Sequence, residues 1–154
     1  MAHILVVDAE TPIRALTARS LILERHDVVD VGTGAEALAA IAARVFDAIV
    51  IDADVPDMDS ADLLAAMARH PGTRATPVVL LTTNDDPDEE LRAAQLGVIE
   101  RLVKPVGFGQ LIATVRRLLA QDRGSVEELR VRRVGAADLY RSSIDLTNQA
   151  RQRT

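Results

Sequence analysis

The run Ile4-Leu5-Val6-Val7-Asp8, four apolar residues that end on an aspartate, sets the pattern of the chain. Three more runs have the same form: Ala48-Ile49-Val50-Ile51 before Asp52, Val78-Val79-Leu80-Leu81 before Thr82, and Val98-Ile99-Glu100-Arg101-Leu102-Val103 before Lys104. Continuous Val, Ile and Leu stretches are typical of parallel strands that are covered on both faces, and the segments between the runs have the apolar spacing of helices. The pattern therefore predicts an α/β fold.

The segments between these runs complete a regular alternation. Helices are expected over about residues 11–25, 34–43, 60–69, 87–97 and 107–120, and a short strand over 28–31. Five strands that alternate with five helices favour a flavodoxin-like, doubly wound five-stranded parallel sheet in the order 2-1-3-4-5. In such a sheet the ligand crevice lies beyond the carboxyl ends of the strands. We expect the polar residues that end the runs to converge there: Asp8, Asp52, Thr82 and Lys104.

Residues 122–154 differ in character from the domain expected over residues 1–121 and are predicted to form a short C-terminal helical extension. Asp122-Arg123-Gly124 should interrupt the preceding helix, and Ser125 to Glu128 has the spacing of a capping box. The pattern predicts a short helix to about Arg133, a break at Gly135 and a second helix to about Gln149. The extension is too short for a typical DNA-binding domain, and we expect it to dock on residues 1–121 or to pair with a second copy of the chain.

Composition and charge exclude several classes of site. The 154 residues include no cysteine, which excludes a disulfide framework and thiolate metal sites. Acidic residues outnumber basic ones in residues 1–121, and the arginines of the tail are mixed with acids, so no direct nucleic-acid binding is expected. The start lacks a signal sequence and no apolar stretch reaches the length of a membrane span. We therefore expect a soluble, cytoplasmic protein that does not contact a membrane.

Lys104 is the only lysine of the chain, and the other seventeen basic residues are all arginine. Arginine presents a flat, forked head, whereas lysine presents a compact ammonium that approaches a single oxygen as a point charge. A lysine at the end of a strand, followed by Pro105, therefore suits a carboxylate or a phosphoryl group.

Together these segments resemble a receiver domain of the two-component response regulators, the CheY-like family. The resemblance covers residues 1 to about 121 and rests on five segments in this order: Ile4 to Asp8, Asp52 to Asp59, Pro77 to Thr82, Gly97, and Lys104-Pro105. It implies a phosphoprotein of phosphorelay signal transduction that takes a phosphoryl group from a sensor histidine kinase or a phosphotransfer protein. It also implies a signalling domain rather than an enzyme, one that assists its own phosphorylation and dephosphorylation.

The resemblance assigns a role to each residue of the expected crevice. Asp52 would be the phosphoryl acceptor, and Asp8, Asp52 and the backbone carbonyl of Asp54 would hold Mg²⁺. Thr82 and Lys104 would bond the phosphoryl group, and the peptide between Lys104 and Pro105 would be cis. These roles suit phosphoryl transfer, which needs positioning and charge neutralisation, and crowded carboxylates favour a divalent cation. Singly, however, an aspartate at a strand end is usually a cap or a turn residue.

The chain departs from the family pattern at four positions. Ala9 replaces an expected acid, so we expect weaker Mg²⁺ binding, with the side chain of Asp54 a nearer substitute than Glu10. Thr83 stands where alanine or glycine is usual and should narrow the access to Asp52. Arg101 replaces an aromatic ring that often reports activation, and it could pair with a carboxylate or serve a partner surface. Ser60 replaces a glycine, which is a milder change.

Three functions compete at this stage. The first is a phospho-accepting receiver that signals by a conformational change to a partner or within a homodimer. The second is a pseudo-receiver, an interaction module that is not phosphorylated, which Ala9, Thr83 and Arg101 favour. The third is an aspartate-nucleophile phosphohydrolase, because Asp52-Ala53-Asp54 resembles the Asp-x-Asp motif of haloacid-dehalogenase-like enzymes. Against it, residues 105–109 carry no acid for the metal motif of that family.

Overall fold

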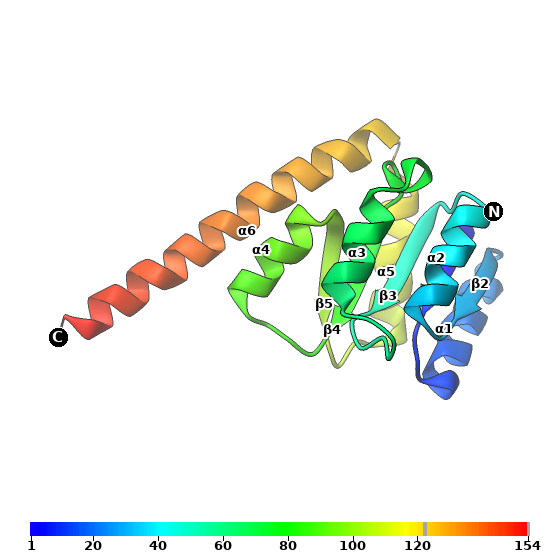
Figure 1. Ribbon diagram of the computed structural model, residues 1–154, viewed down its shortest axis with the longest axis horizontal. Helices are drawn as coiled ribbons and strands as arrows, with labels where there is room; N and C mark the ends of the chain where they lie inside the picture. Colours follow the sequence, from blue (N-terminus) through cyan, green and yellow to red (C-terminus); the bar gives the residue numbers. More distant parts are fainter. Residues whose placement is uncertain (122, 154) are drawn as a thin grey trace.

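A five-stranded parallel sheet forms the centre of the molecule (Figure 1). The computed structural model describes residues 1–121 and 123–153, except for the side chains of residues 123–125 and 127. The strands are β1 (His3–Val7), β2 (Asp27–Val31), β3 (Ala48–Asp52), β4 (Val78–Thr82) and β5 (Val98–Val103). They pair in the order β2-β1-β3-β4-β5, which confirms the predicted doubly wound topology.

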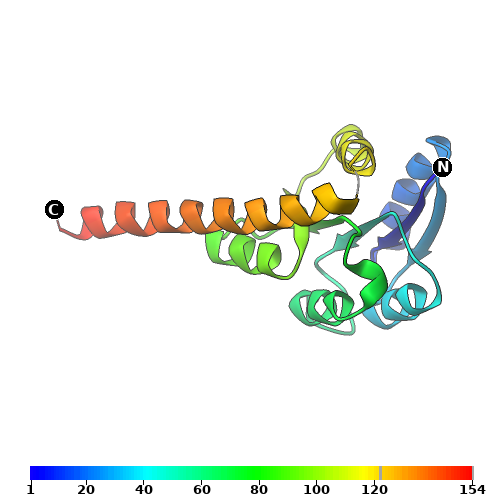
Figure 2. The same cartoon turned by 90° about the horizontal axis from the view of Figure 1, so that it is seen from above.

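Helices cover both faces of this sheet. They are α1 (Thr11–Leu23), α2 (Gly34–Ala43), α3 (Ser60–Ala68), α4 (Pro87–Gln95) and α5 (Phe108–Leu119), with a short 3-10 turn η1 (Pro71–Thr73) before β4. Helices α1 and α5 lie on one face and α2, α3 and α4 on the other, as the view in Figure 2 shows. Three of the helices begin at a residue whose side chain accepts a backbone N–H of the first turn, as capping residues do: Thr33, Asp59 and Asp86.

The core consists of two apolar layers, one on each face of the sheet. Alternate side chains of a strand point to opposite faces, so Leu5 and Val7 of β1 join the layer under α2, α3 and α4, whereas Ile4 and Val6 join the layer under α1 and α5. Every residue of β3 and β4 is buried. Burial on both faces explains why these strands appear in the sequence as unbroken apolar runs.

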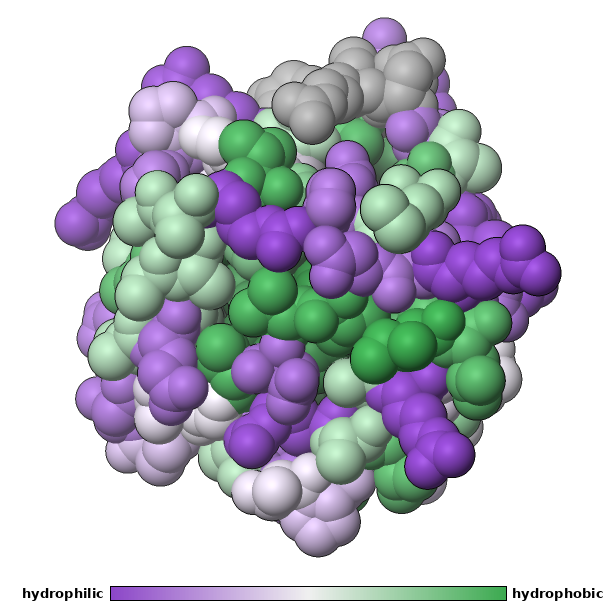
Figure 3. Space-filling model, turned by 90° about the vertical axis from the view of Figure 1, so that its right-hand side faces the viewer, coloured by the Kyte–Doolittle hydropathy of each residue, from purple (hydrophilic) through white to green (hydrophobic). Residues whose placement is uncertain are grey.

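Strand β2 forms one edge of the sheet and is protected by charge. Asp27 pairs with Arg44 at 3.0 Å, and Asp30 pairs with Arg14 at 3.0 Å. Figure 3 looks at the molecule from the side on which β2 lies and shows hydrophilic side chains around and between the apolar ones. Charged side chains on an edge strand hinder its pairing with another chain.

The tail is one continuous helix, α6 (Arg123–Gln152), so the predicted break at Gly135 is wrong. The predicted interruption of the preceding helix is confirmed, because α5 ends at Leu119 and α6 begins at Arg123. The break lies slightly earlier than predicted, since Arg123 and Gly124 already belong to α6, while Asp122 lies outside the described residues. Glycine in a helix costs only about 1 kcal/mol relative to alanine. Packing of α6 against α4 offsets this cost, because Ala137 is buried with Leu91 and Ala94 of α4.

Helix α6 begins beside α5, runs along α4 and extends beyond the sheet domain (Figures 1 and 2). Its buried Val126 joins the apolar layer under α1 and α5. The predicted docking of the tail on residues 1–121 is therefore seen, and its pairing with a second copy of the chain stays a prediction. Among the helices that the structure describes, none has a stretch long and apolar enough to cross a membrane.

Candidate functional site

The four polar residues that end the apolar runs lie together at the carboxyl ends of the strands, as predicted. Asp52 and Thr82 are the last residues of β3 and β4, and Asp8 and Lys104 directly follow β1 and β5. Asp8, Asp52 and Thr82 are buried, with 5%, 4% and 7% of their surfaces exposed. Backbone hydrogen bonds between neighbouring strands continue to these carboxyl ends, for example from Lys104 N–H to the Thr82 carbonyl at 2.7 Å. The parallel sheet therefore brings together side chains that are far apart in the sequence.

Three of these side chains are oriented by the same kind of turn. Asp8 Oδ1 accepts the N–H of Glu10 at 2.9 Å, Asp52 Oδ1 accepts that of Asp54 at 2.9 Å, and Thr82 Oγ1 accepts that of Asn84 at 3.1 Å. Short polar side chains that bond a backbone N–H two residues further on are typical turn formers. The ordinary interpretation of these residues as turn formers is thus correct, and the same turns point them into a shared crevice.

Lys104 provides the positive charge of this crevice. Its Nζ forms a hydrogen-bonded ion pair with Asp52 Oδ2. Burial alone would lower the pKa of Lys104. However, its hydrogen bond to Asp52 and the charges of Asp52, Asp54 and Asp8 outweigh burial, so the pKa lies above its ordinary value. The side chain therefore stays charged and holds the carboxylate of Asp52. The peptide between Lys104 and Pro105 is cis, as the resemblance implied.

Asp8 lies in an environment that disfavours its charge. Burial raises the pKa of Asp8, and the charge of Asp52 raises it further, whereas the hydrogen bond from Glu10 lowers it. Arg14 of α1 donates to the Asp8 carbonyl at 2.9 Å and also pairs with Asp30 of β2. Arg14 therefore fixes the turn after β1. Sequence reasoning missed this residue, because nothing in the spacing of a single arginine identifies its contact.

Two cavities open at the carboxyl ends of the strands. One, of about 460 Å³, contains Asp8, Asp52 and Lys104 together with apolar residues of α1 and α5, among them Ile13 and Phe108. The second, of about 360 Å³, lies beyond Thr82 and is lined by Asp54, Thr83 and Arg101, among others. Asp52 is thus reached from the first cavity, whereas the exposed Thr83 lines the second.

The oxygen donors of the crevice suit a hard cation such as Mg²⁺, which is commonly held by one or two carboxylates and completes its shell with water. Burial is the main cause of the raised pKa of Asp8, and the charge of the nearby Asp52 carboxylate raises it further. Within the described ranges, no three acidic or histidine side chains form a group that could hold a metal ion. The side chains of Asp54 and Glu10 therefore do not complete a three-carboxylate site beside the exposed Ala9 in this conformation.

Two other carboxylates of the acidic loop between β3 and α3 have structural roles. Asp57 accepts the N–H groups of Gly34 and Ala35 at the start of α2, at 2.8 and 3.0 Å, and these bonds lower its pKa. Asp59 caps α3 by accepting the N–H of Ala61 at 2.7 Å. These bonds fix the loop that follows Asp52.

Arg101 points back into the protein and takes the first of its two predicted roles, pairing with a carboxylate. Its side chain is only 5% exposed and lies 3.8 Å from Glu90 of α4. It also donates a hydrogen bond to the carbonyl of Asn84, in the loop between β4 and α4. Asn84 and Glu90 were not identified from the sequence, because their positions depend on how α4 packs against β5.

Comparison with known proteins identifies the family. The family model described as "Response regulator receiver domain" matches residues 4–116. Among curated relatives, the transcriptional regulatory protein TcrA of Mycobacterium tuberculosis is 34% identical over 116 residues, which are 75% of this chain and 45% of TcrA. The transcriptional regulatory protein KdpE of the same organism is 28% identical over 127 residues, which are 82% of this chain and 55% of KdpE. The chain thus spans about half the length of these relatives.

Solved structures give the same result. The chemotaxis response regulator CheY4 of Vibrio cholerae is 30% identical and superposes with a TM-score of 0.72 over 77% of this chain and 98% of CheY4. The receiver domain of the Francisella response regulator 1452 is 27% identical, with a TM-score of 0.71 over 77% of this chain and 97% of that domain. A family match over most of the chain and the shared fold lead to one conclusion: this chain belongs to the response regulator receiver domain family.

Proposed function

We propose that this receiver domain takes a phosphoryl group onto Asp52 from a phosphohistidine of a sensor histidine kinase or a phosphotransfer protein. The observation that carries the proposal is the ion pair between Asp52 and Lys104, in a cavity that also contains Asp8, while Thr82 lines the neighbouring cavity. A buried carboxylate that is oriented by a backbone N–H and faces a cation and a cavity is well placed to act as a nucleophile toward phosphorus.

The transfer forms a bond between a carboxylate oxygen of Asp52 and phosphorus, and it breaks the P–N bond of the phosphohistidine. The electron pair of the broken bond stays on the imidazole ring, which then takes up a proton. Phosphoryl transfer depends mainly on positioning and on neutralising the charge of the transferring oxygens. Lys104 supplies positive charge on one side of Asp52, and the Thr82 hydroxyl supplies a hydrogen-bond donor. Hydrolysis of the acyl phosphate by water returns the carboxylate and inorganic phosphate.

The carboxylates of Asp8 and Asp52 and the carbonyl of Asp54 would hold Mg²⁺. The ion supplies charge neutralisation for the phosphoryl oxygens when it is bound. Because Ala9 contributes no carboxylate, we expect a higher Mg²⁺ concentration to be needed than at a site with one more acid.

A second candidate is the pseudo-receiver, which the two-carboxylate donor set favours. The two candidates predict the same fold and differ in whether Asp52 is modified. The family assignment gives no support to the third candidate, the phosphohydrolase. For the receiver, we expect output through a partner protein or a second copy of the chain, which the phosphorylated conformation would bind differently.

Intact mass after treatment with acetyl phosphate tests this function. We expect a phosphoryl adduct on the wild-type chain in Mg²⁺, loss of the adduct in EDTA, and no adduct on Asp52→Asn. Unmodified wild-type protein that remains folded in excess Mg²⁺ and acetyl phosphate would instead support the pseudo-receiver.

A further inference from the structure

Helix α6 is attached to the domain at three successive points. Arg130 binds the start of β4 and the end of α4, Arg133 pairs with Glu90 of α4 at 2.7 Å, and Arg141 pairs with Asp88 of α4 at 2.9 Å. Apolar contacts of Val134 and Ala137 with α4 lie between these ion pairs. The attachment therefore runs along α4, away from the first turns of α6.

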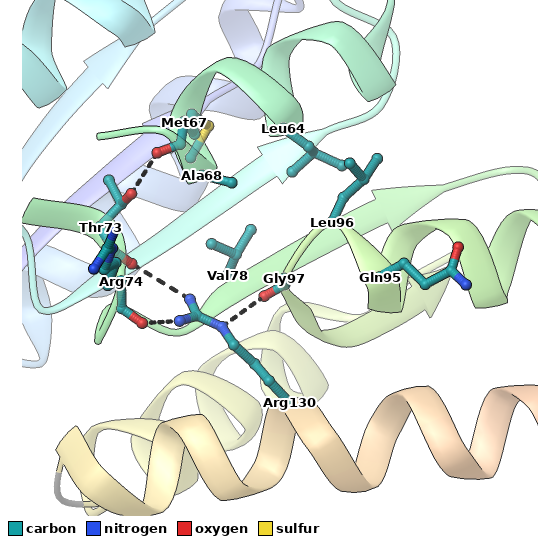
Figure 4. A pocket seen from close by; sticks show the side chains of 10 residues that line it. All are labelled: Leu64, Met67, Ala68, Thr73, Arg74, Val78, Gln95, Leu96, Gly97 and Arg130. Carbon is teal, nitrogen blue, oxygen red and sulfur yellow. Dashed lines mark hydrogen bonds between the residues drawn. The ribbon is translucent and has the colours of Figure 1, made fainter. Parts of the chain in front are cut away.

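The attachment at Arg130 does not involve the crevice. Figure 4 shows its Nε donating to the Gly97 carbonyl at 3.1 Å and its terminal nitrogens donating to the carbonyls of Arg74 and Thr73. A terminal nitrogen also donates to the carbonyl of Thr76 at 2.6 Å. These acceptors lie at the opposite end of the sheet from Asp52, near the start of β4 and β5. Arg130 should therefore hold the first turns of α6 whatever happens at the crevice.

The attachment at Arg133, in contrast, is connected to Thr82 by consecutive polar contacts. Thr82 Oγ1 accepts the N–H of Asn84, and the Asn84 carbonyl accepts a hydrogen bond from Arg101. Arg101 faces Glu90 Oε2 at 3.8 Å, and Glu90 Oε1 accepts from Arg133 at 2.7 Å. The carboxylate of Glu90 thus lies between the buried guanidinium of Arg101 on β5 and the partly buried guanidinium of Arg133 on α6.

We propose that Asn84, Arg101 and Glu90 form a polar relay between Thr82 and α6, through which phosphorylation of Asp52 loosens α6 beyond Arg130. The inference rests on the function proposed above. If Thr82 turns to bond a phosphoryl oxygen, Asn84 moves with it and its carbonyl leaves Arg101. The side chain of Arg101 is only 5% exposed, so it then turns to the carboxylate of Glu90, closes the 3.8 Å gap and draws that carboxylate away from Arg133.

Thermodynamic linkage makes the relay reciprocal. If phosphorylation weakens the docking of α6, then weakening that docking must favour the phosphorylated conformation by the same factor. Arg101 is therefore a positioning residue for the loop of Thr82, and Arg133 acts on the crevice from a helix that does not contact it. A merely structural role for Arg133 would affect the stability of α6 without affecting ligand binding at Asp52.

Hydrogen exchange on the full chain, with beryllofluoride and Mg²⁺ as a phosphoryl mimic, tests the relay. We expect amide protection over residues 133–141 to fall about fivefold or more on binding, the lower end of typical couplings, while protection over 126–130 changes little. Reciprocally, Arg133→Ala should bind beryllofluoride more tightly than the wild type by a similar factor, as followed by the Thr82 amide signal in NMR spectra. Arg132→Ala, which removes the same charge from an exposed neighbouring position, should leave the affinity unchanged.

The outcomes separate the relay from the proposed function. Absence of beryllofluoride binding, together with absence of an acetyl phosphate adduct, would overturn both. Binding that leaves the protection of residues 133–141 unchanged, or an unchanged affinity in Arg133→Ala, would overturn the relay alone. Equal effects of Arg132→Ala and Arg133→Ala would also overturn it, because a general charge effect would then explain the result.

Discussion

Lys104 Nζ and Asp52 Oδ2 form an ion pair between two residues that are 52 positions apart in the chain. The Asp52 side chain is 6% exposed and that of Lys104 is 28% exposed, so the pair is only partly screened by water. Asp8 adds a second carboxylate whose pKa is raised by burial and by Asp52. The single lysine of the chain thus balances a crowded pair of carboxylates.

Replacement of Lys104 by alanine should therefore destabilise the fold. We expect a loss of about 1–3 kcal/mol in the free energy of unfolding, the usual cost of leaving a buried charged partner without its hydrogen bond. Mg²⁺ should restore part of this loss, because the ion would take over the neutralisation of Asp8 and Asp52. Urea denaturation with and without Mg²⁺ measures both effects. Arg116→Ala, which breaks an exposed ion pair with Glu24, serves as the control and should cost at most about 1 kcal/mol.

Restoring an acid at position 9 should strengthen metal binding. We expect Ala9→Asp to lower the Mg²⁺ concentration at half-maximal acetyl phosphate loading by on the order of tenfold, since the number of charged ligands tunes the affinity of oxygen-ligand sites. Without Mg²⁺ the same variant should be less stable than the wild type, because a third carboxylate joins the crevice. Ala9→Asn has a similar shape without the charge and should show neither effect. An unchanged Mg²⁺ requirement in Ala9→Asp would show that position 9 is not at the metal site.

Thr83 should not control the modification of Asp52, because it does not line the cavity that contains Asp52. Thr83 is exposed and lines the cavity beyond Thr82, together with Asp54. We expect Thr83→Ala and Thr83→Ser to form the adduct from acetyl phosphate at the wild-type rate, as followed by intact mass over time. A several-fold faster reaction in Thr83→Ala would instead support the expectation from the sequence that this side chain narrows the access to Asp52.

Asp57 should make the stability of the fold depend on acid pH. The N–H groups of Gly34 and Ala35 lower its pKa in the folded state, so its contribution is fully present above the ordinary pKa of aspartate and is lost as the pH falls through the lowered value. Asp57→Asn should therefore be less stable than the wild type at neutral pH, and the difference should narrow toward about pH 3. Urea denaturation across this range measures it. Asp145→Asn, an exposed position on α6, should show no such convergence.

The sheet and its strand-end residues could be predicted because the signals are local. Burial on both faces makes β1, β3 and β4 continuous apolar runs, and the topology then brings Asp8, Asp52, Thr82 and Lys104 to one edge. The four roles assigned to these residues remain predictions, since no ligand contact tests them.

Features that depend on packing between distant elements could not be predicted. Gly135 suggested a break, but Ala137 packs on α4 and nothing in the local sequence shows that contact. Arg101 was identified as unusual, yet its contacts with Asn84 and Glu90 depend on the register of β5 against β4 and on the position of α4. Likewise, the capping of α2 by Asp57 joins two loops that are remote in sequence.

The most direct test of the central claim is to locate the phosphoryl group on the chain. After treatment with acetyl phosphate and Mg²⁺, borohydride reduces an aspartyl phosphate to homoserine, and peptide mass spectrometry then identifies the residue. We expect homoserine at position 52 in the wild-type chain and at no position in Asp52→Asn. Reduction at Asp8, at Asp54 or at another carboxylate, with Asp52 intact, would contradict the assignment of Asp52 as the phosphoryl acceptor.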